Sequence, residues 1–161
     1  MITEWDKIYM RFTEDIAIQS KCAAKKVGCV IVRGTTVLSN GINGTLSGHL
    51  NCCDKFVKKD DGWYTYGEED FMKCDNEEEH HRWSNIHEFH AEMNAIKNAT
   101  DNGHSVKGST IYCNYSPCYN CAKLLVLHGI NRIVYRNEYD DFENIKKFLE
   151  LSEVEVIKYG V

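Results

Sequence analysis

The sequence predicts a layered α/β domain, in which helices pack against a β-sheet. Two observations lead to this class. The chain has 161 residues, which suits a single domain, and its 43% hydrophobic and 27% charged residues are ordinary for a globular protein. Segments with helical periodicity also alternate along the chain with short apolar runs that resemble strands. We therefore expect residues 1–161 to form one domain.

The first part of the chain predicts one helix followed by two strands. Apolar residues recur at helical spacing over residues 4–20, which indicates an amphipathic helix. The run VGCVIV at 27–32 is apolar nearly throughout, so it predicts a strand that is buried on both faces. A turn at 33–36 leads into a second strand that begins at 37–40, and 41–48 is a loop punctuated by glycines.

Residues 49–86 interrupt this regular pattern. The segment has no clean period, and it contains two acidic runs with cysteine and histidine near its ends. Long loops inside compact domains are usually functional or held in place by another group. We expect an insertion without regular structure that is held by a metal ion.

Regular elements are expected again from residue 90 onward. The predicted order is a helix over 90–103, a strand over 109–115, a helix over 116–129, a strand over 131–136, a helix over 140–151 and a strand over 154–159. Ser116 is the expected N-cap of the helix over 116–129, and Pro117, the only proline of the chain, suits its first turn. Gly129 marks the end of that helix.

Composition excludes several classes of protein. No apolar run approaches the roughly 20 residues of a membrane span, and the N-terminus lacks the features of a signal peptide. We therefore expect a cytoplasmic protein, in the host cytoplasm if it is viral. In that reducing compartment, the eight cysteines favour metal sites or buried thiols over disulfides. The net charge of −5 is a poor match to a nucleic-acid strand as partner.

Two short motifs indicate a catalytic zinc site. His90 and Glu92 open one predicted helix, while Cys118 and Cys121 lie three positions apart at the start of another. Two thiolates and one imidazole leave the fourth tetrahedral position of zinc free for water, and Glu92 can then move protons. The pair of motifs, H-x-E followed by P-C-x-x-C, is typical of zinc deaminases. The alternative is a closed structural zinc site with Glu92 as its fourth ligand.

Beyond these motifs, the sequence resembles the cytidine deaminase superfamily, and within it the bacteriophage-type deoxycytidylate (dCMP) deaminases. The resemblance extends over KVGCVIV at 26–32, GINGTLSG at 41–48, NCC at 51–53, HEFHAEMNAI at 87–96, SPCYNCAKLL at 116–125 and VYRNEYD at 134–140. It implies a three-layer α/β/α fold with a mixed five-stranded sheet. It also implies hydrolysis of dCMP to dUMP and ammonia, which supplies dUMP for dTMP synthesis.

The resemblance further implies how the protein assembles and which residues touch substrate. Family members form homohexamers that are commonly activated by dCTP and inhibited by dTTP, with Mg²⁺ on the triphosphate. Glu92 would be the proton carrier. The substrate contacts would be Asn43 to the sugar, Ala91 and Glu92 to the base, Tyr115 and Ser116 as pocket lining, and Tyr139 and Lys26 to the phosphate. Tyr115 and Tyr139 could instead be packing residues at strand ends.

Other cysteines and histidines are candidates for a second metal site. The pool is Cys22, Cys29, Cys52, Cys53, Cys74, His80, His81, His87 and Glu88. Cys29 lies in the apolar strand and is expected in the core. The resemblance places a structural zinc on Cys22, Cys52, His80 and Glu88, with His81 and His87 as competitors. Cys53 and Cys74 are expected to be packing thiols.

Two further classes of function remain open. The same zinc chemistry could act on cytidine, dCTP, a purine base or adenosine in transfer RNA. Outside enzymes, the chain could be an interaction module that zinc holds together.

Overall fold

A mixed five-stranded sheet forms the centre of the molecule. The computed structural model describes residues 1–66, 71–74 and 77–160. The sheet has the order β2-β1-β6-β7-β8. Its strands are β1 (Gly28–Arg33), β2 (Thr36–Ile42), β6 (Thr110–Tyr115), β7 (Arg132–Asn137) and β8 (Glu155–Lys158). Because β1 is antiparallel to β2 and β6 while β6, β7 and β8 run parallel, the predicted mixed sheet is confirmed.

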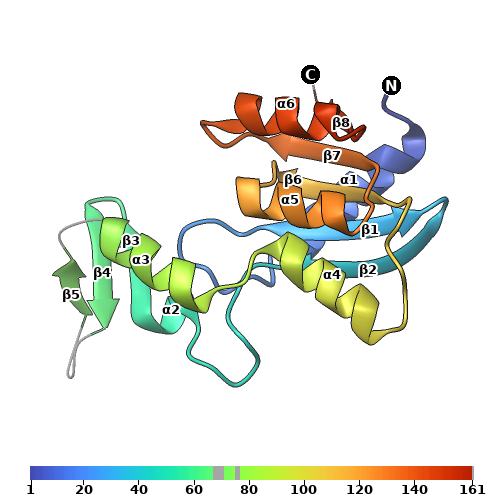
Figure 1. Ribbon diagram of the computed structural model, residues 1–161. Helices are drawn as coiled ribbons and strands as arrows, with labels where there is room; N and C mark the ends of the chain where they lie inside the picture. Colours follow the sequence, from blue (N-terminus) through green and yellow to red (C-terminus); the bar gives the residue numbers. More distant parts are fainter. Residues whose placement is uncertain (67–70, 75–76, 161) are drawn as a thin grey trace.

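Helices cover both faces of this sheet, as the predicted three-layer fold requires. Helix α1 (Glu4–Ala17) lies on one face, and α4 (Ala91–Asp101), α5 (Tyr119–Leu127) and α6 (Phe142–Leu151) lie on the other (Figure 1). Within β1, Cys29 and Ile31 belong to the core beneath α4 to α6, whereas Val30 and Val32 belong to the core beneath α1. The alternation confirms that this strand is buried on both faces. In the described ranges, no helix has the length and apolar character that crossing a bilayer requires.

Residues 49–86 form a small lobe with its own regular structure, so the prediction of an irregular insertion is wrong. The lobe contains α2 (Cys52–Lys55), β3 (Phe56–Lys59), β4 (Gly62–Tyr66), β5 (Phe71–Cys74) and α3 (Glu77–His87). Its strands form an antiparallel sheet of order β3-β4-β5. Lys59 pairs with Gly62, so Asp60 and Asp61 form a two-residue hairpin loop, which is a recognisable turn signal. These strands were not predicted because each is only four or five residues long, which leaves little repeating pattern to recognise.

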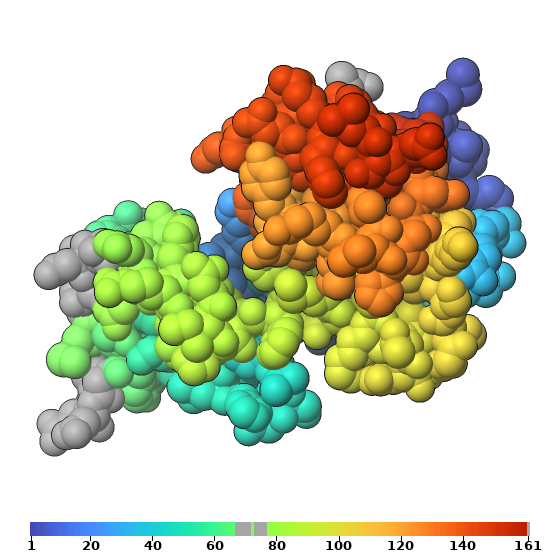
Figure 2. All heavy atoms as spheres, in the orientation of Figure 1, coloured from blue at the N-terminus to red at the C-terminus, as the bar shows by residue number. Residues whose placement is uncertain are grey.

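The lobe projects from one end of the central sheet. Figure 1 shows its strands and α3 beside the body, and Figure 2 shows the surface hollowed between the lobe and the C-terminal half of the chain. The lobe has a small core of its own, in which Cys22, Cys52, Phe56 and Trp63 are buried and Trp83 packs against them. The lobe therefore stands beside the body as one wall of a hollow.

The boundaries of several elements differ from the predictions. Helix α1 ends at Ala17 rather than near residue 20, and β2 continues to Ile42. Helix α5 begins at Tyr119 with Cys118 as its N-cap, so the prediction that Ser116 caps it is wrong. Instead, the Ser116 backbone N–H donates to the Asn137 carbonyl at 2.8 Å, and its hydroxyl accepts from the Tyr139 N–H at 3.1 Å. Ser116 thus extends the pairing of β6 with β7 and is fully buried.

A glycine lets α4 approach the sheet closely. A Cβ atom at Gly41 would lie 2.3 Å from both the Ala91 carbonyl oxygen and the Ala95 nitrogen. No side chain fits in that space, so the first turn of α4 can pack directly on β2. This close contact fixes the distance between the first turn of α4 and the sheet.

A buried ion pair fastens α1 to the sheet. The Asp6 carboxylate is 2% exposed and accepts hydrogen bonds from Arg132 Nη1 at 2.7 Å and Arg132 Nη2 at 3.1 Å. Tyr112 Oη donates to the same carboxylate at 2.7 Å, and the Thr3 backbone N–H does so at 2.7 Å. Burial by itself would raise the pKa of Asp6, but the hydrogen bonds from Arg132, Tyr112 and Thr3 together lower it well below its usual range.

Replacing Arg132 is therefore expected to destabilise the fold. In Arg132→Met the buried Asp6 carboxylate loses its charge partner, which should cost about 3–5 kcal/mol of unfolding free energy at pH 7. A depressed carboxyl pKa stabilises the fold fully above the unfolded value of about 3.9, and this stabilisation is lost as the pH falls through the folded value. The difference between wild type and variant should therefore shrink below about pH 4. Urea unfolding at several pH values measures it.

A matched control is Arg136→Met. Arg136 forms a half-exposed ion pair with Glu14, which should contribute less than about 1 kcal/mol. Equal losses in the two variants, or a loss for Arg132→Met that does not depend on pH, would contradict the assigned role of the buried pair.

Candidate active site and metal centres

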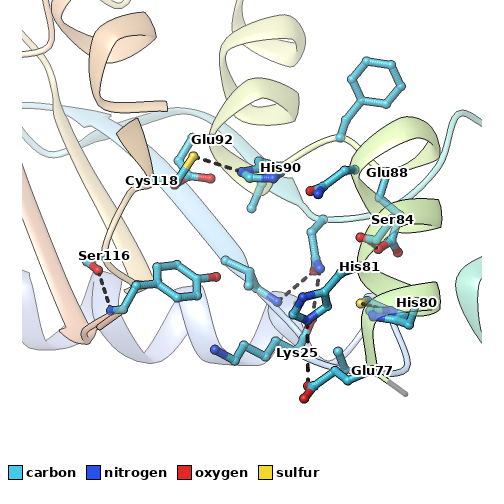
Figure 3. Close-up of a pocket in the computed structure, with 18 of the residues that line it drawn as sticks. Lys25, Glu77, His80, His81, Ser84, Glu88, His90, Glu92, Ser116 and Cys118 are labelled. Carbon is cyan, nitrogen blue, oxygen red and sulfur yellow. Dashed lines mark hydrogen bonds and ion pairs between the residues drawn. The ribbon is translucent and has the colours of Figure 1, made fainter. Parts of the chain in front are cut away.

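A cavity of about 590 Å³ lies where the lobe meets the ends of the central strands. Its walls come from the segment before β1, from α3, from the start of α4 and from the loops that follow β6 and β7. Figure 3 shows His90, Glu92 and Cys118 at one end of this pocket, and His80, Glu88 and Ser84 on the wall that α3 forms. Residues of the predicted catalytic zinc site and of the predicted second zinc site therefore line the same cavity.

The predicted zinc ligands come together where two helices begin. His90 is the N-cap of α4, Cys118 is the N-cap of α5, and Cys121 lies one turn further on. The His90 Nδ1 atom is 3.5 Å from the Cys118 Sγ and 3.4 Å from the Cys121 Sγ. These three donor atoms all lie within 4.8 Å of one another.

The chemistry of this cluster fits a zinc ion. The hydrogen bond from Cys121, followed by that from His90, lowers the pKa of the Cys118 thiol to about 4, so a thiolate is present at neutral pH. The hydrogen bond with Cys118 raises the pKa of His90. Helix N-termini stabilise negative charge, and two sulfur ligands with one nitrogen leave a coordination position open. The residues therefore suit a catalytic rather than a closed site.

Glu92 lies beside the cluster and apart from its donor set. It is 4% exposed, and its carboxylate lies within 4.8 Å of the thiols of Cys29 and Cys113. These two thiols are fully buried on paired positions of β1 and β6, with their sulfur atoms 2.9 Å apart. Burial raises the pKa of Glu92 above its ordinary value. A buried carboxyl group beside possible metal ligands is placed to exchange protons with a bound reactant.

The second predicted cluster also comes together, at the junction between lobe and body. Cys22, Cys52, His80 and Glu88 place one donor atom each within 4.8 Å of the others. The His80 Nε2 atom is 3.2 Å from the Cys52 Sγ and 3.9 Å from the Cys22 Sγ. Trp63 stacks on the His80 ring with centroids 4.4 Å apart and an interplanar angle of 22°, so the ring is held in place.

One carboxylate oxygen of Glu88 in this cluster has no hydrogen-bond partner among the described residues. Glu88 Oε2 accepts a hydrogen bond from the Ser84 hydroxyl at 2.5 Å, but Glu88 Oε1 is buried without a partner. Burial raises the pKa of Glu88 to about 7. A metal ion would satisfy the orphaned oxygen, and two sulfurs, one nitrogen and one oxygen match the donors of a structural zinc site.

The remaining members of the predicted pool lie outside this cluster. His81 faces Glu77 at 3.8 Å, and His87 packs against Trp83 with ring centroids 4.8 Å apart. Cys29 lies in the core as predicted. Cys53 is exposed, so the prediction of a packing thiol is wrong for this residue. It follows the buried Cys52 directly on a helix, where adjacent side chains point in different directions. The side chain of Cys74 lies outside the described residues.

The predicted substrate contacts divide into two groups. Asn43, Ala91, Ser116 and Tyr139 line the cavity together with Glu92. Tyr115 and Lys26 are not among its lining residues. The Tyr115 ring packs against Tyr139 with centroids 5.4 Å apart, and the Lys26 ammonium donates to the Ile18 carbonyl at 3.1 Å.

Of the adjacent residues Lys25 and Lys26, only Lys25 lines the pocket, whereas the family resemblance had pointed to Lys26. The pair Lys25-Lys26 shows that a cation stands just before the strand. Which of the two lysines faces the pocket depends on the path of the segment between α1 and β1. The dipeptide alone carries no signal that distinguishes them.

Comparisons with known proteins agree with this site and fold. The family model described as the cytidine and deoxycytidylate deaminase zinc-binding region matches residues 3–137. The deoxycytidylate deaminase of Enterobacteria phage T4 is 35% identical over 144 residues, which cover 78% of this chain and 74% of that protein. The deoxycytidylate deaminase of Schizosaccharomyces pombe is 29% identical over 158 residues, covering 96% and 44% of the two chains.

A solved structure of a dCMP deaminase is also similar to this chain. The dCMP deaminase of cyanophage S-TIM5 in complex with dCMP and dUMP superposes with a TM-score of 0.73 at 31% identity, covering 98% of each chain. The α/β architecture with its mixed five-stranded sheet is thus shared with a dCMP deaminase structure. From its sequence, its fold and the residues of its cavity, this chain belongs to the cytidine and deoxycytidylate deaminase family.

Proposed function

We propose that this protein is a zinc-dependent deaminase that hydrolyses dCMP to dUMP and ammonia. The observation that carries the proposal is the buried carboxyl group of Glu92 beside the three donors His90, Cys118 and Cys121 in one cavity. The described relatives from phages are dCMP deaminases, and one of them has been solved with dCMP and dUMP. These likenesses support dCMP as the substrate.

In this proposal, His90, Cys118 and Cys121 hold the zinc ion and Glu92 moves the protons. A bound zinc ion lowers the pKa of a water molecule, which makes it nucleophilic at neutral pH. Glu92 takes the proton from the attacking water and delivers it to N3 of the cytosine ring. It then passes a proton to the amino group that leaves C4 as ammonia. The cavity excludes bulk water from the carboxyl group, which favours these transfers over loss of the proton to solvent.

We also propose a structural role for the second cluster. Cys22, Cys52, His80 and Glu88 would hold a second zinc ion, and the orphaned Glu88 oxygen supports this. Such an ion would join the segment after α1 to α2 and to α3, and so fix the lobe against the body. The lobe wall of the cavity would then depend on metal.

The family resemblance supports further parts of the proposal. These are supply of dUMP for dTMP synthesis, activation by dCTP and inhibition by dTTP with Mg²⁺, assembly as a homohexamer, and action in the cytoplasm. Ala91, Ser116 and Tyr139 line the cavity, which supports their proposed contacts with the substrate. The amide of Asn43 is bonded within the protein, to Ser20, Val27 and the Lys25 carbonyl, which supports a role in shaping the pocket near the sugar.

The proposed activity predicts selective turnover of the nucleoside monophosphate. We expect purified protein to convert dCMP, followed by the loss of cytosine absorbance in the ultraviolet, while cytidine and adenosine are left unchanged. A reaction with dCTP alone tests whether dCTP is a substrate. A reaction with dCMP, dCTP and Mg²⁺ tests whether dCTP activates the turnover of dCMP. Turnover of another amine substrate in place of dCMP would refute the assignment.

A further inference from the structure

Lys25 brings a positive charge to the cavity that contains the catalytic cluster. Its ammonium nitrogen lies 4.5 Å from the centre of the Tyr139 ring and 5.2 Å from that of the Tyr115 ring. The two rings form a tilted pair that holds the cation over its faces. Figure 3 shows Lys25 in the same pocket as His81 and Glu77. Within the described residues, no carboxylate forms an ion pair with it, so its charge is available to a ligand.

The backbone of Lys25 is fixed relative to the catalytic end of the cavity. Its carbonyl accepts a hydrogen bond from Asn43 Nδ2 at 2.9 Å, and Asn43 Oδ1 accepts from the Val27 N–H at 2.8 Å. Asn43 directly follows β2, whose Gly41 packs against the helix that begins at His90. These contacts fix the backbone from which the Lys25 side chain reaches the cavity.

Other charged groups that line the cavity are less free to bind an anion. On the lobe side, His81 faces Glu77 at 3.8 Å, and the ammonium of Lys58 lies over the Trp63 ring at 5.4 Å. Glu88 belongs to the second metal cluster, and Asp140 adds a negative charge near Tyr139. Acidic groups and a net charge of −5 disfavour anions in general, so Lys25, which pairs with no carboxylate of the described residues, is the lining cation best able to attract one.

We propose that Lys25 recognises the 5′-phosphate of the substrate and thereby selects the nucleotide over the nucleoside. The inference rests on the proposed function and adds the residue that determines its phosphate requirement. On binding, the ammonium would donate charge-assisted hydrogen bonds to the phosphate oxygens, next to the Tyr139 side chain. We do not assign this role to the adjacent Lys26, because it does not line the cavity and its ammonium donates to the Ile18 carbonyl.

The two neighbouring lysines provide a matched pair of variants. In Lys25→Met we expect kcat/KM for dCMP to fall about 10- to 100-fold, mainly through KM, because a hydrogen bond to a charged group is lost. The low turnover of deoxycytidine should stay unchanged, and Lys25→Arg should recover most of the dCMP activity. Lys26→Met should remain within about twofold of wild type. A loss in Lys26→Met instead, or equal losses for dCMP and deoxycytidine in Lys25→Met, would overturn the inference.

A binding measurement separates this inference from the proposed reaction. Calorimetric titration of the zinc-loaded protein with dUMP and with deoxyuridine reports phosphate recognition without turnover. We expect wild type to prefer dUMP and Lys25→Met to lose most of that preference. Unchanged preference in Lys25→Met would overturn the role of Lys25, even if dCMP is deaminated. If Lys25→Met loses the preference for dUMP but wild type never deaminates dCMP, phosphate recognition by Lys25 would stand while the proposed function would be contradicted.

Discussion

Glu92→Gln is expected to abolish deamination of dCMP while leaving the zinc content unchanged. Glutamine has nearly the same shape, but its amide cannot accept the proton of the attacking water or pass one to the leaving amine. General acid–base catalysis contributes roughly 10²–10⁴-fold, and Glu92 serves more than one transfer, so we expect a loss at the upper end of this range. The loss should appear in kcat, since the substitution keeps the size of the side chain and leaves the other residues of the pocket unchanged.

The measurement combines an absorbance assay with elemental analysis of zinc. Glu150→Gln is a suitable control, because Glu150 is an exposed residue of α6 and has no place in the cavity. Retention of turnover within about tenfold of wild type in Glu92→Gln would exclude Glu92 as the proton carrier. Simultaneous loss of zinc would instead indicate that Glu92 is a ligand, as in a closed structural site.

Cys52→Ser is expected to remove one of two zinc ions per chain and to loosen the lobe. Cys52 is fully buried, and its sulfur lies 3.2 Å from the His80 Nε2 atom. A hydroxyl group is a much poorer zinc ligand than a thiolate, so the second site should be lost while the first is kept. The lobe core contains few buried side chains, and most of its stability then depends on the metal.

The neighbouring cysteine provides the control for this prediction. Cys53→Ser should bind zinc as wild type does, because Cys53 is exposed. In Cys52→Ser, tryptophan fluorescence should also change, since Trp63 stacks on His80 and Trp83 packs in the same core. Susceptibility to limited proteolysis within residues 49–86 should rise. An unchanged zinc content in Cys52→Ser would refute the second site.

Much of the catalytic centre could be predicted because its residues lie close together in two short motifs. His90 and Glu92 are separated by one residue, and Cys118 and Cys121 by two, so local helix geometry nearly sets their relative placement. The alternating helices and strands likewise predicted the layers, since periodicity reports which side of an element is buried. The second cluster was reached only through the family resemblance, because its ligands extend from residue 22 to residue 88.

Local patterns failed where long-range contacts decide the outcome. Ser116 has the composition of a helix cap, but pairing with Asn137 draws it into the sheet. The lobe strands are only four or five residues long, and they are stabilised by a core that includes Cys22 from outside the segment. In each case the deciding partner is far away in the sequence, so propensity at the residue itself carries little information.

By itself, the sequence determined the fold class, and it was enough to propose the zinc donors and the proton carrier, since these inferences depend on periodicity and on spacings of a few residues. The tertiary structure decided which of two adjacent lysines faces the pocket, because the Asn43 amide holds the backbone of Lys25 in place. It also decided that the lobe forms one wall of the active cavity. Such choices follow from the packing of distant segments, which a local sequence pattern does not contain.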